Sequence, residues 1–553
     1  MKMNDKKKVA ILSNVTIDLI AAKLRKQYDF YIPEGFDTWV QEVINPTSVL
    51  YTTKIDAVIV LLDGTEARSW DTETEGIERI GIWKQAFSVL LERIGRIPIF
   101  VSTIDIRENR IKSLSERKVR YELENDWYQY IQDLVERKDN VYLLDIADTI
   151  MEIGRRQFYS NKMWYMSNMP YSRDGLDAVS IEIGRVLDAA FKGRRKAITV
   201  DLDNTLWGGV IGEDGIEGIE LSKHKEGQRY YDFQRQLFEM KKRGIVFTIN
   251  SKNNPEDAEM AIEKHPSMIF RIEDFVSRKI NWESKVVNLK ATIDELNLTE
   301  GGFIFVDDNP VEREMVKGEC AGVLVPDFPA DTTELLVFAE NLWFEHCRPL
   351  RILDEDRKKT QMYRNEAKRK QDLSQSLNLD DYIAKLEMQV DIHRMRPEEI
   401  ERVTQLINKT NQFNVTTNRY TKAEIEEIAN ARDKAIYVTS SSDKYGEHGL
   451  ISVIVLVENN GSVRIDSFLM SCRVMGRRLE DVIMNEILAK YMDRKVFVGE
   501  FKQTEKNLPV KNLYDRLGFK LVTEKDGQKI YEFDMKDFKK KFFDSYKEIV
   551  FEE

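Results

Sequence analysis

Short runs of apolar and β-branched residues recur through the first 190 residues, separated by amphipathic segments with a helix-like pattern. The runs read KKVAILSN, IDAVIVLLDG, IPIFVSTI and NVYLLDI. Continuous apolar runs of this length are typical of strands buried on both faces, as in a parallel sheet covered by helices. We therefore expect an open α/β sheet in this part of the chain.

A second α/β pattern begins at Lys196 and ends near residue 350. Its apolar runs are KAITVDLDNT, GIVFTINS and GGFIFVDDNP, and its longest helical stretch is NWESKVVNLKATIDELNL. The charged segment DEDRKKTQMYRNEAKRKQDLSQSLNL lacks Gly and Pro, which predicts an exposed helical connector. The rest of the chain has an α+β pattern, with a hairpin expected at ENNGS.

The length of 553 residues exceeds what one compact core can hold, since domains usually span about 100–200 residues. The predicted fold class is α/β with three domains, the last of them α+β. The expected limits are 1–195, 196–350 and 381–553, with 351–380 as the connector.

The formal net charge is −11, which argues against a general nucleic-acid or anionic-membrane binder. No stretch approaches the 18 or more apolar residues of a membrane span, and the apolar run near the start is too short for a signal peptide. We therefore expect a cytoplasmic protein that binds neither nucleic acid nor membranes. The three cysteines are irregularly spaced, which fits neither a disulfide framework nor a zinc site.

Polar residues with phosphoryl-transfer chemistry follow three apolar runs of the second domain. Asp201 and Asp203 end the first run, Ser251 ends the next, and Asp307 and Asp308 follow the third. Lys285 opens a predicted helix that should return to the same edge of the sheet, where ligands of such folds collect. Carboxylates, a hydroxyl and a lysine are what a magnesium-dependent phosphoryl transfer uses.

The order DxDxT, S, K, DD resembles the haloacid dehalogenase (HAD) superfamily. The resemblance implies that Asp201 is the nucleophile, Asp203 the general acid/base, and that Ser251 and Lys285 contact the phosphoryl group. Thr205 would help to fix the loop, and Asp201, Asp203, Asp307 and Asp308 are the candidate Mg²⁺ ligands. The alternative is that these aspartates are only turn formers and helix caps, which four ordered motifs make the weaker interpretation.

The stretch LWGGVIGEDG after Thr205 leaves no room for a large cap domain. Together with SKNNPEDA and FVDDNPVERE it resembles the FkbH-like subgroup of HAD proteins. That resemblance implies transfer of a D-glyceryl group from 1,3-bisphosphoglycerate to the phosphopantetheine thiol of an acyl carrier protein, with removal of phosphate, in polyketide-type pathways.

The carboxyl-terminal domain offers a candidate site for a thioester. Arg473, Gly476 and Arg477 lie between a predicted strand and a helix, where backbone N–H groups can cradle a phosphate. With Asn507 and Tyr514 in NLPVKNLYDRLGF, this part resembles GNAT acyltransferases. The resemblance implies binding of coenzyme A or of the same pantetheine arm on a carrier protein.

Cys472 precedes this loop and is a candidate acyl acceptor, since Arg473 and a helix N-terminus favour its thiolate. A small buried hydrophobe is the other interpretation of Cys472. A three-residue hairpin loop, residues 459–461, would place His448 opposite Cys472, whereas a two-residue loop would place it opposite Arg473. His448 is therefore a candidate base, and a structural role is the alternative.

The amino-terminal domain resembles an SGNH-hydrolase-like α/β fold. It has LSNVTIDLI where such hydrolases carry their nucleophile block, and no histidine precedes His224, so a Ser-His-Asp triad cannot form within it. We expect a docking or scaffolding role. For the whole chain, the alternatives to glyceryl transfer are a plain HAD phosphatase with a carrier-binding tail, or a GNAT-type acyltransferase using acyl-CoA with a non-catalytic HAD unit.

Overall fold

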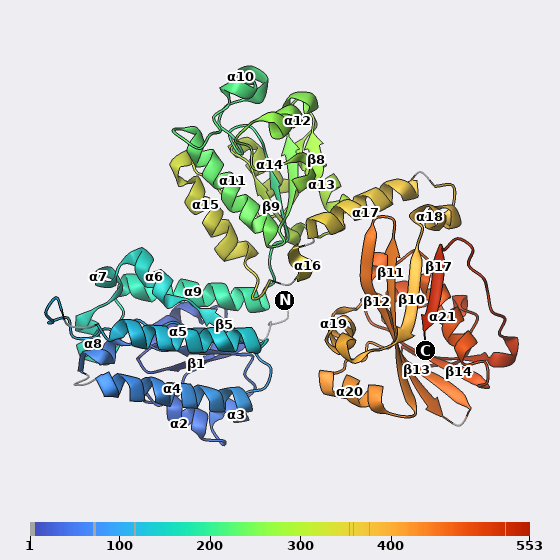
Figure 1. Ribbon diagram of the computed structural model, residues 1–553, viewed down its shortest axis with the longest axis horizontal. Coiled ribbons are helices and arrows are strands. Elements are labelled where there is room, and N and C mark those ends of the chain that lie inside the picture. Colours follow the sequence, from blue (N-terminus) through green and yellow to red (C-terminus); the bar gives the residue numbers. More distant parts are fainter. Residues whose placement is uncertain are drawn as a thin grey trace. The chain divides into compact units, whose positions relative to one another are not determined.

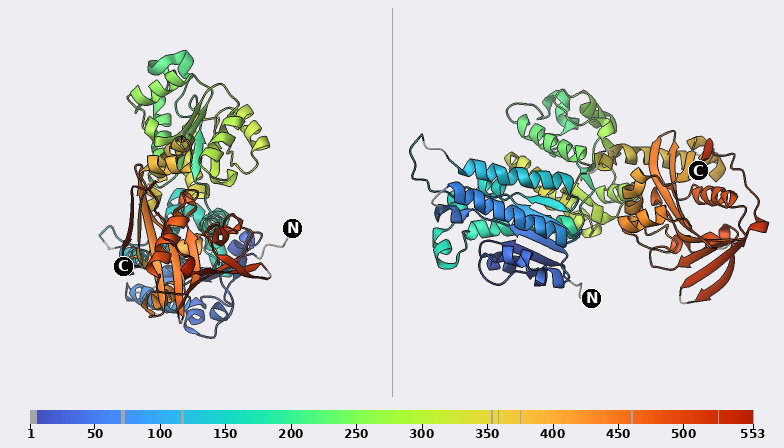
Figure 2. Two further views of the ribbon diagram at one scale, coloured as in Figure 1. Left: turned by 90° about the vertical axis from the view of Figure 1, so that its right-hand side faces the viewer. Right: turned by 60° about the horizontal axis from the view of Figure 1, so that its bottom comes forward.

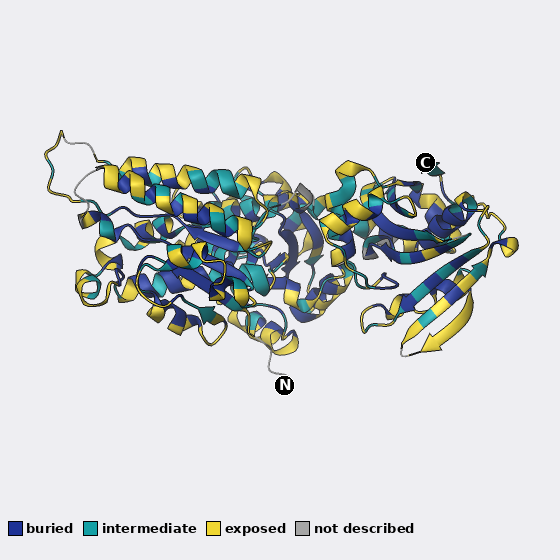
Figure 3. Cartoon of the chain, turned by 90° about the horizontal axis from the view of Figure 1, so that it is seen from below, coloured by how far each residue is buried: buried dark blue, intermediate teal, exposed yellow. Residues whose placement is uncertain are grey.

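The computed structural model describes residues 6–69, 73–115, 118–352, 354–357, 359–374, 376–459, 461–525 and 527–552. The chain divides into two compact units, Met1–Thr360 and Gln361–Glu553 (Figure 1). In the first unit, buried strands lie between helices whose outer faces are exposed (Figure 3). Among the described residues, no helix is both long enough and apolar enough to cross a membrane.

The first unit begins with a parallel five-stranded sheet; the four apolar runs form β1, β3, β4 and β5, and β2 was not expected from the sequence. The strand order is β2-β1-β3-β4-β5. Alternate residues of β1 point to opposite faces, so Val9 and Ile11 enter one core while Ala10 and Leu12 enter the other. Burial on both faces explains why the strands read as unbroken apolar runs. The strands are β1 (Lys8–Ser13), β2 (Asp29–Tyr31), β3 (Ala57–Leu61), β4 (Ile99–Ser102) and β5 (Val141–Leu144).

Helices cover both faces of this sheet. The core on one face includes residues of α1 and α9, and the core on the other includes residues of α4 and α5. These helices are α1 (Asp18–Leu24), α4 (Glu73–Arg93), α5 (Arg120–Arg137) and α9 (Arg173–Phe191). The shorter helices α6 (Ile146–Ile153), α7 (Arg155–Phe158) and α8 (Asn161–Ser167) follow β5.

The same unit contains a second parallel sheet of four strands in the order β8-β7-β6-β9. The strands are β6 (Ala197–Val200), β7 (Val246–Ser251), β8 (Phe275–Ile280) and β9 (Phe303–Val306). Its helices include α10 (Ile211–Gly218), α11 (Gly227–Lys242), α12 (Pro255–Lys264), α13 (Lys285–Glu295) and α14 (Pro310–Glu319). The expected helix at Lys285 is confirmed, whereas β8 is a strand that the sequence analysis missed. The limit at 195/196 falls between the two sheets and stays a prediction.

The second unit is built on one eight-stranded sheet, which can be followed in Figure 2. Its order is β15-β16-β14-β13-β12-β11-β10-β17. The strands are β10 (Gln389–Arg394), β11 (Lys434–Asp443), β12 (Gly446–Asn459), β13 (Ser462–Met470), β14 (Val496–Lys502), β15 (Lys520–Lys525), β16 (Gln528–Asp534) and β17 (Glu548–Glu552). Helices α19 (Ile400–Lys409), α20 (Lys422–Asn430) and α21 (Leu479–Lys490) connect them.

Strands β13 and β14 pair in parallel over Ser462–Ile465 and Val496–Gly499, and the pairing stops there although β13 continues to Met470. Residues 413–416 occupy the opening between the two strands. The Val415 N–H donates to the Phe468 carbonyl, and the Val415 carbonyl accepts from the Lys502 N–H. The chain's own backbone therefore satisfies groups that the diverging strands would otherwise leave free.

The hairpin of β12 and β13 decides between the two loop lengths that the sequence leaves open. Asn459 pairs with Ser462, so the loop has two residues rather than three. A bulge then shifts the register between Val455 and Leu456, and the ladder ends with Ser452 opposite Met470. The ladder therefore pairs His448 with neither of the two expected residues, Cys472 or Arg473, because the bulge shifts the register and β13 ends at Met470.

The charged connector is helical in its described residues, as predicted, with α16 (Asp354–Arg357) and α17 (Lys359–Ser374). Helix α18 (Leu379–Leu386) begins at its end and lies mostly beyond it. It is not exposed throughout. Arg369 of α17 is 5% exposed and forms a two-pronged ion pair with the buried Asp443, at 2.7 and 2.9 Å. The part of α17 from Gln361 on therefore packs within the second unit.

Candidate phosphoryl-transfer site

Three carboxylates meet at the carboxyl edge of the four-stranded sheet. Asp201 follows β6, and Asp307 and Asp308 follow β9, which pairs with β6. One carboxylate oxygen from each lies within 4.8 Å of the others. Asp307 is fully buried and Asp201 nearly so. The expected convergence of these residues is therefore present.

Lys285, the first residue of α13, supplies the positive charge at this point. Its Nζ lies 3.0 Å from Asp201 Oδ1 and 2.6 Å from Asp307 Oδ2. Two asparagines hold the start of the helix: Asn250 Nδ2 donates to the Lys285 carbonyl at 2.7 Å, and Asn288 Nδ2 donates to Asn250 Oδ1 at 3.3 Å. These asparagines are positioning residues that the sequence analysis did not identify.

Burial dominates the electrostatics of the group. It raises the pKa of Asp201 and of Asp307, and Lys285 opposes both shifts. Burial also raises the pKa of Asp308, and the neighbouring Asp201 adds to that shift. For Lys285, burial lowers the pKa, but the two carboxylates outweigh it and the net shift is upward. Three carboxylates facing one ammonium favour an additional cation.

The donor set fits a magnesium ion. Carboxylate oxygens are the ligands that Mg²⁺ prefers in proteins. Among the described residues, no donor reaches the buried Asp201 Oδ1 with hydrogen-bond geometry, although Lys285 Nζ is close. Asp201, Asp307 and Asp308 would therefore hold the ion.

Asp203 lies beside this group and makes a different set of contacts. Its Oδ1 accepts from Trp207 Nε1 at 3.0 Å and from the Ile211 N–H at 3.1 Å. Asn253 Nδ2 donates to Asp203 Oδ2 at 3.0 Å and to Ser251 Oγ at 3.1 Å. The Asp203 carboxylate is outside the acidic group. Its role as a metal ligand and the catalytic roles of Asp203 and Ser251 stay predictions, and Asn253 is a further residue that the sequence analysis missed.

Thr205 ties the first loop to the third. The Asp308 N–H donates to Thr205 Oγ1 at 3.2 Å, and Thr205 Oγ1 lies 3.5 Å from Asp308 Oδ1. The glycines that follow are needed for close packing: a Cβ on Gly208 would lie 2.7 Å from the ring of Tyr230. The flap that they begin contains only the short helix α10, so it is small, as predicted.

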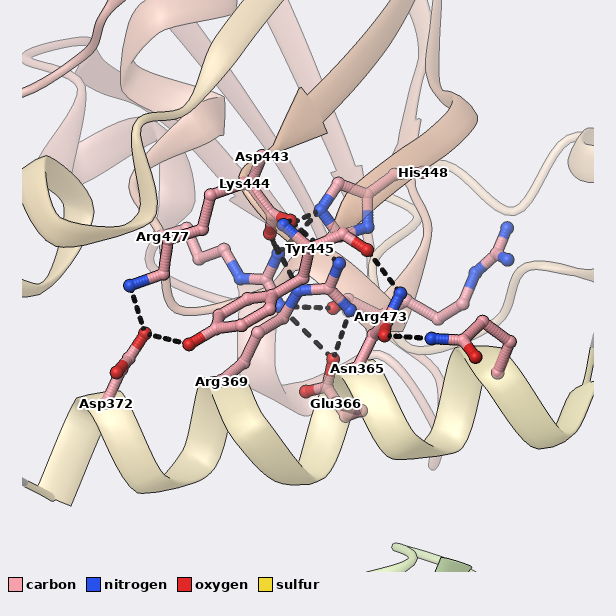
Figure 4. A network of polar contacts seen from close by, with 11 residues as sticks. Asn365, Glu366, Arg369, Asp372, Asp443, Lys444, Tyr445, His448, Arg473 and Arg477 are labelled. Carbon is pink, nitrogen blue, oxygen red and sulfur yellow. Dashed lines mark hydrogen bonds and ion pairs between the residues drawn. The ribbon is translucent and has the colours of Figure 1, made fainter. Parts of the chain in front are cut away.

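The candidate cofactor residues of the second unit are used within the fold. Arg477 is 3% exposed, and its Nη1 lies 3.1 Å from His448 Nε2 while its Nη2 donates to the Arg473 carbonyl at 3.2 Å (Figure 4). Gly476 has a φ of +79°, which suits the turn before α21. The Arg477 guanidinium thus points into the protein rather than toward a ligand, so its role in binding a cofactor is not supported by its contacts.

His448 belongs to the same network. Its Nε2 lies 3.0 Å from Asp443 Oδ2, and Arg369 and Glu366 approach from α17 (Figure 4). Burial alone would raise the pKa of Asp443, but His448 and Arg369 outweigh it and hold that pKa well below its usual range. Burial lowers the pKa of His448. The side chain of Cys472 lies outside the described residues, so a pairing of Cys472 with His448 stays a prediction.

Asn507 and Tyr514 also contact the protein itself. Asn507 Nδ2 donates to the carbonyls of Asn414 and Lys502, at 2.9 and 2.8 Å, and so fixes residues 413–416 in the opening beside β14. Tyr514 is buried against Gly499, where a Cβ would lie 2.5 Å from its ring. Both residues have clear structural roles, and their predicted cofactor roles remain untested.

The chain is similar in structure to the N-terminal part of the protein BF1531 from Bacteroides fragilis, which contains a phosphatase domain and was crystallised with Mg. The two are 25% identical with a TM-score of 0.55, and the match covers 62% of this chain and 95% of that one. The ribosomal-protein-S18-alanine N-acetyltransferase of Escherichia coli (9% identity, TM-score 0.22) covers 26% of this chain and 94% of its own.

A spermidine N-acetyltransferase mutant from Vibrio cholerae also matches, with 14% identity and a TM-score of 0.22, over 27% of this chain and 94% of its own. The similarity to these two acetyltransferases, at a TM-score of 0.22, does not assign an activity. No family model and no curated protein matches the sequence. Fold and site together define an α/β chain with a phosphatase-like acidic centre.

Proposed function

We propose that the chain is a magnesium-dependent phosphoryl-transfer enzyme of the HAD type, with Asp201 as the nucleophile. The observation that carries the proposal is the meeting of Asp201, Asp307, Asp308 and Lys285 at one sheet edge, with Lys285 within ion-pair distance of two of the carboxylates. The resemblance to a Mg-bound phosphatase-domain structure supports it.

In this proposal, an oxygen of Asp201 attacks the phosphorus, the bond to the leaving oxygen breaks, and an aspartyl phosphate forms. Asp203, held by Trp207 and Asn253, donates a proton to the leaving group and then takes one from the water that hydrolyses the intermediate. Lys285 stabilises the ionised Asp201 and the phosphoryl oxygens. Bound Mg²⁺ would offset the negative charge that carboxylates and phosphate share.

The specific reaction is transfer of a D-glyceryl group from 1,3-bisphosphoglycerate to the phosphopantetheine thiol of an acyl carrier protein, with removal of phosphate. A thiol attacks the acyl carbon and displaces the 1-phosphate, and the 3-phosphate is removed through Asp201 and hydrolysed. Its support is the FkbH-like pattern of the Asp201 loop and the small flap, which leaves room for a bulky substrate. Cys472 holds the acyl group on the way in this scheme. The proposal includes the three domains, with the amino-terminal one as a docking unit and the last one as a GNAT-like unit, and a cytoplasmic location.

The test incubates the full chain with 1,3-bisphosphoglycerate, Mg²⁺ and a holo carrier protein, followed by intact mass measurement of both proteins. A glyceryl adduct on the carrier is expected, and it should disappear with Asp201→Asn. Phosphate release without any acyl adduct would leave the plain phosphatase and remove the transfer reaction. If Cys472→Ser transfers normally, the carrier thiol attacks directly.

The alternative is that the second unit is a GNAT-type acyltransferase that uses acyl-CoA, with a non-catalytic HAD unit. Acyl transfer from acyl-CoA by the Asp201→Asn variant would establish that alternative, because it needs no phosphoryl chemistry. Residues 413–416 occupy the opening between β13 and β14, and the backbone of Val415 bonds to both strands there. A pantetheine arm would find these backbone groups already paired, which makes this alternative the weaker one.

A further inference from the structure

A basic cavity opens at the carboxyl edge of the five-stranded sheet. Its volume is about 880 Å³, within the usual range for small-molecule sites. Eight of its fifteen lining residues are Arg or Lys and one, Glu108, is acidic, in a chain whose net charge is −11. The lining comes from segments that follow β3, β4 and β5, the edge at which parallel α/β sheets bind ligands.

Two arginines of this cavity converge on one neutral acceptor. Arg68 Nη1 donates to Asn161 Oδ1 at 2.8 Å, and Arg107 Nη2 reaches the same oxygen at 3.5 Å. Arg107 also lies over the ring of the buried Tyr159, 4.0 Å from its centroid, and bonds to Thr65 Oγ1 at 3.3 Å. Ring stacking and these bonds fix the guanidinium in place.

Some of the basic residues of the cavity lack an acidic partner among the described residues, although Lys112 pairs with Glu108 at 2.8 Å. Among the residues that the structure describes, no carboxylate lies within ion-pair distance of Arg68, Arg107 or Arg156, whereas Arg155 pairs with Asp105. Holding guanidinium groups close together without a counter-charge is unfavourable in the free protein. A ligand with several negative charges would offset that cost, and the planar guanidinium matches phosphate oxygens two at a time.

The approach of the two loops that carry these arginines is built into the backbone. A Cβ on Gly64 would lie 2.5 Å from the Asp105 carbonyl oxygen and 2.8 Å from Ile106 Cα, so only glycine lets the loop after β3 pass this close to the loop after β4. Arg68 lies four residues beyond Gly64, and Arg107 directly follows Ile106. The crossing therefore keeps the side chains of Arg68 and Arg107 at the same cavity.

The other polar groups at this edge do not form a hydrolytic centre. Asn14 is bonded through its side chain to both backbone groups of Asp63, at 2.8 and 2.9 Å, and Thr65 donates its N–H to Asp63 Oδ1. No histidine occurs before His224 in the sequence. Binding rather than bond cleavage is the chemistry that remains.

We propose that this cavity binds a small molecule carrying two or more phosphate groups, with Arg68 and Arg107 as the principal ligands. The site is separate from the Asp201 centre and does not depend on the proposed phosphoryl transfer. An acidic protein surface is a different kind of polyanion that could bind here, and the experiment below distinguishes it from a phosphate-bearing small molecule.

Calorimetric titration of the full chain with inorganic pyrophosphate, in EDTA so that the Asp201 group carries no divalent ion, tests the proposal. We expect one binding event that weakens with added salt, since the ligand is held by charge. The double variant Arg68→Gln/Arg107→Gln should bind at least about tenfold more weakly, because each substitution removes a charge-assisted hydrogen bond. Arg137→Gln, an exposed arginine of α5 outside the cavity, is the matched control and should bind like the parent.

Three results would overturn the proposal: no binding of pyrophosphate, equal binding by the double variant, or equally tight binding of citrate, which would mean that phosphate is not recognised. Binding of an acidic protein that pyrophosphate cannot displace would also overturn it. Hydrolysis of p-nitrophenyl phosphate in Mg²⁺ is measured separately on each variant. That activity should stay unchanged in the double variant, so the failure of this site and the failure of the Asp201 site are told apart.

Discussion

Replacing Lys285 by Met tests whether one ammonium group holds the acidic centre together. Lys285 and its two partner carboxylates are all less than a tenth exposed, and the ion-pair distances are 3.0 and 2.6 Å. At an effective dielectric constant of about 20, unit charges 3 Å apart attract by about 5 to 6 kcal/mol. Removing the lysine also removes the cost of burying it, so a net loss of about 3 to 5 kcal/mol in the free energy of unfolding is expected.

The loss should depend on pH. Without the lysine, Asp201 and Asp307 titrate with pKa values raised further above those of the unfolded chain by burial. A carboxyl group whose folded pKa is raised favours the fold while it is protonated, and this contribution is lost as the pH rises through the folded pKa. Lys285→Met should therefore be closest to the parent in mild acid and fall furthest below it above neutrality.

The measurement is hydrogen–deuterium exchange of peptides that cover β6 and β9, in urea and without divalent ions, because these report on the sheet beneath the site. Lys290→Met is the matched control, since Lys290 lies on the same helix in an exposed ion pair 3.5 Å from Glu319 and should cost less than about 1 kcal/mol. Equal destabilisation by the two variants, or a loss that shrinks as the pH rises, would refute the electrostatic reasoning.

Three further outcomes are expected. Mg²⁺ should raise the melting temperature of the first unit, and Asp308→Asn should reduce that rise; an undiminished rise would mean that Asp308 is not a ligand. Because burial lowers the pKa of His448, stability of the second unit should be lost as the pH falls below about 6.5, the ordinary pKa of histidine, and His448→Gln should flatten that dependence in urea titrations. Tyr514→Phe should leave stability unchanged or raise it by up to about 1 kcal/mol, because the buried hydroxyl has no partner among the described residues; a clear loss in thermal unfolding would show an interaction there.

The acidic centre could be predicted because its residues end apolar strands. A strand buried on both faces is visible as an unbroken run, and the residue after it lies at the sheet edge whatever the rest of the fold does. For this reason the sequence alone predicts that Asp201 and Asp307, which follow two such strands, lie at the same sheet edge. The amides of Asn250, Asn253 and Asn288 were missed, since side chains that position others leave no periodic pattern. Of the three, Asn253 could have been found from the sequence, because it lies two residues after Ser251 in SKNNPEDA.

Other features depend on tertiary structure that a local pattern does not encode. Strand β8 was missed because its apolar run is interrupted: Ser277, Arg278 and Lys279 follow two apolar residues, and Arg278 is exposed and Lys279 half-buried at the edge of the sheet. The hairpin register was uncertain because one bulge near Asp466 shifts every pair beyond it. The contacts of Arg477 and His448 follow from that register and from a helix that is distant in the sequence.

The buried pair between Arg369 and Asp443 also determines how the chain can be divided for experiments. A fragment that begins at residue 381, the predicted limit of the last domain, would contain Asp443 without the arginine that neutralises it. Asp443 would lose its two-pronged partner and keep His448 at 3.0 Å and Arg477 at 3.8 Å, so the loss would reach the loop before α21 through these two residues. A fragment that begins at Gln361 keeps the pair, and with it the part of the connector that is a structural element of the second unit.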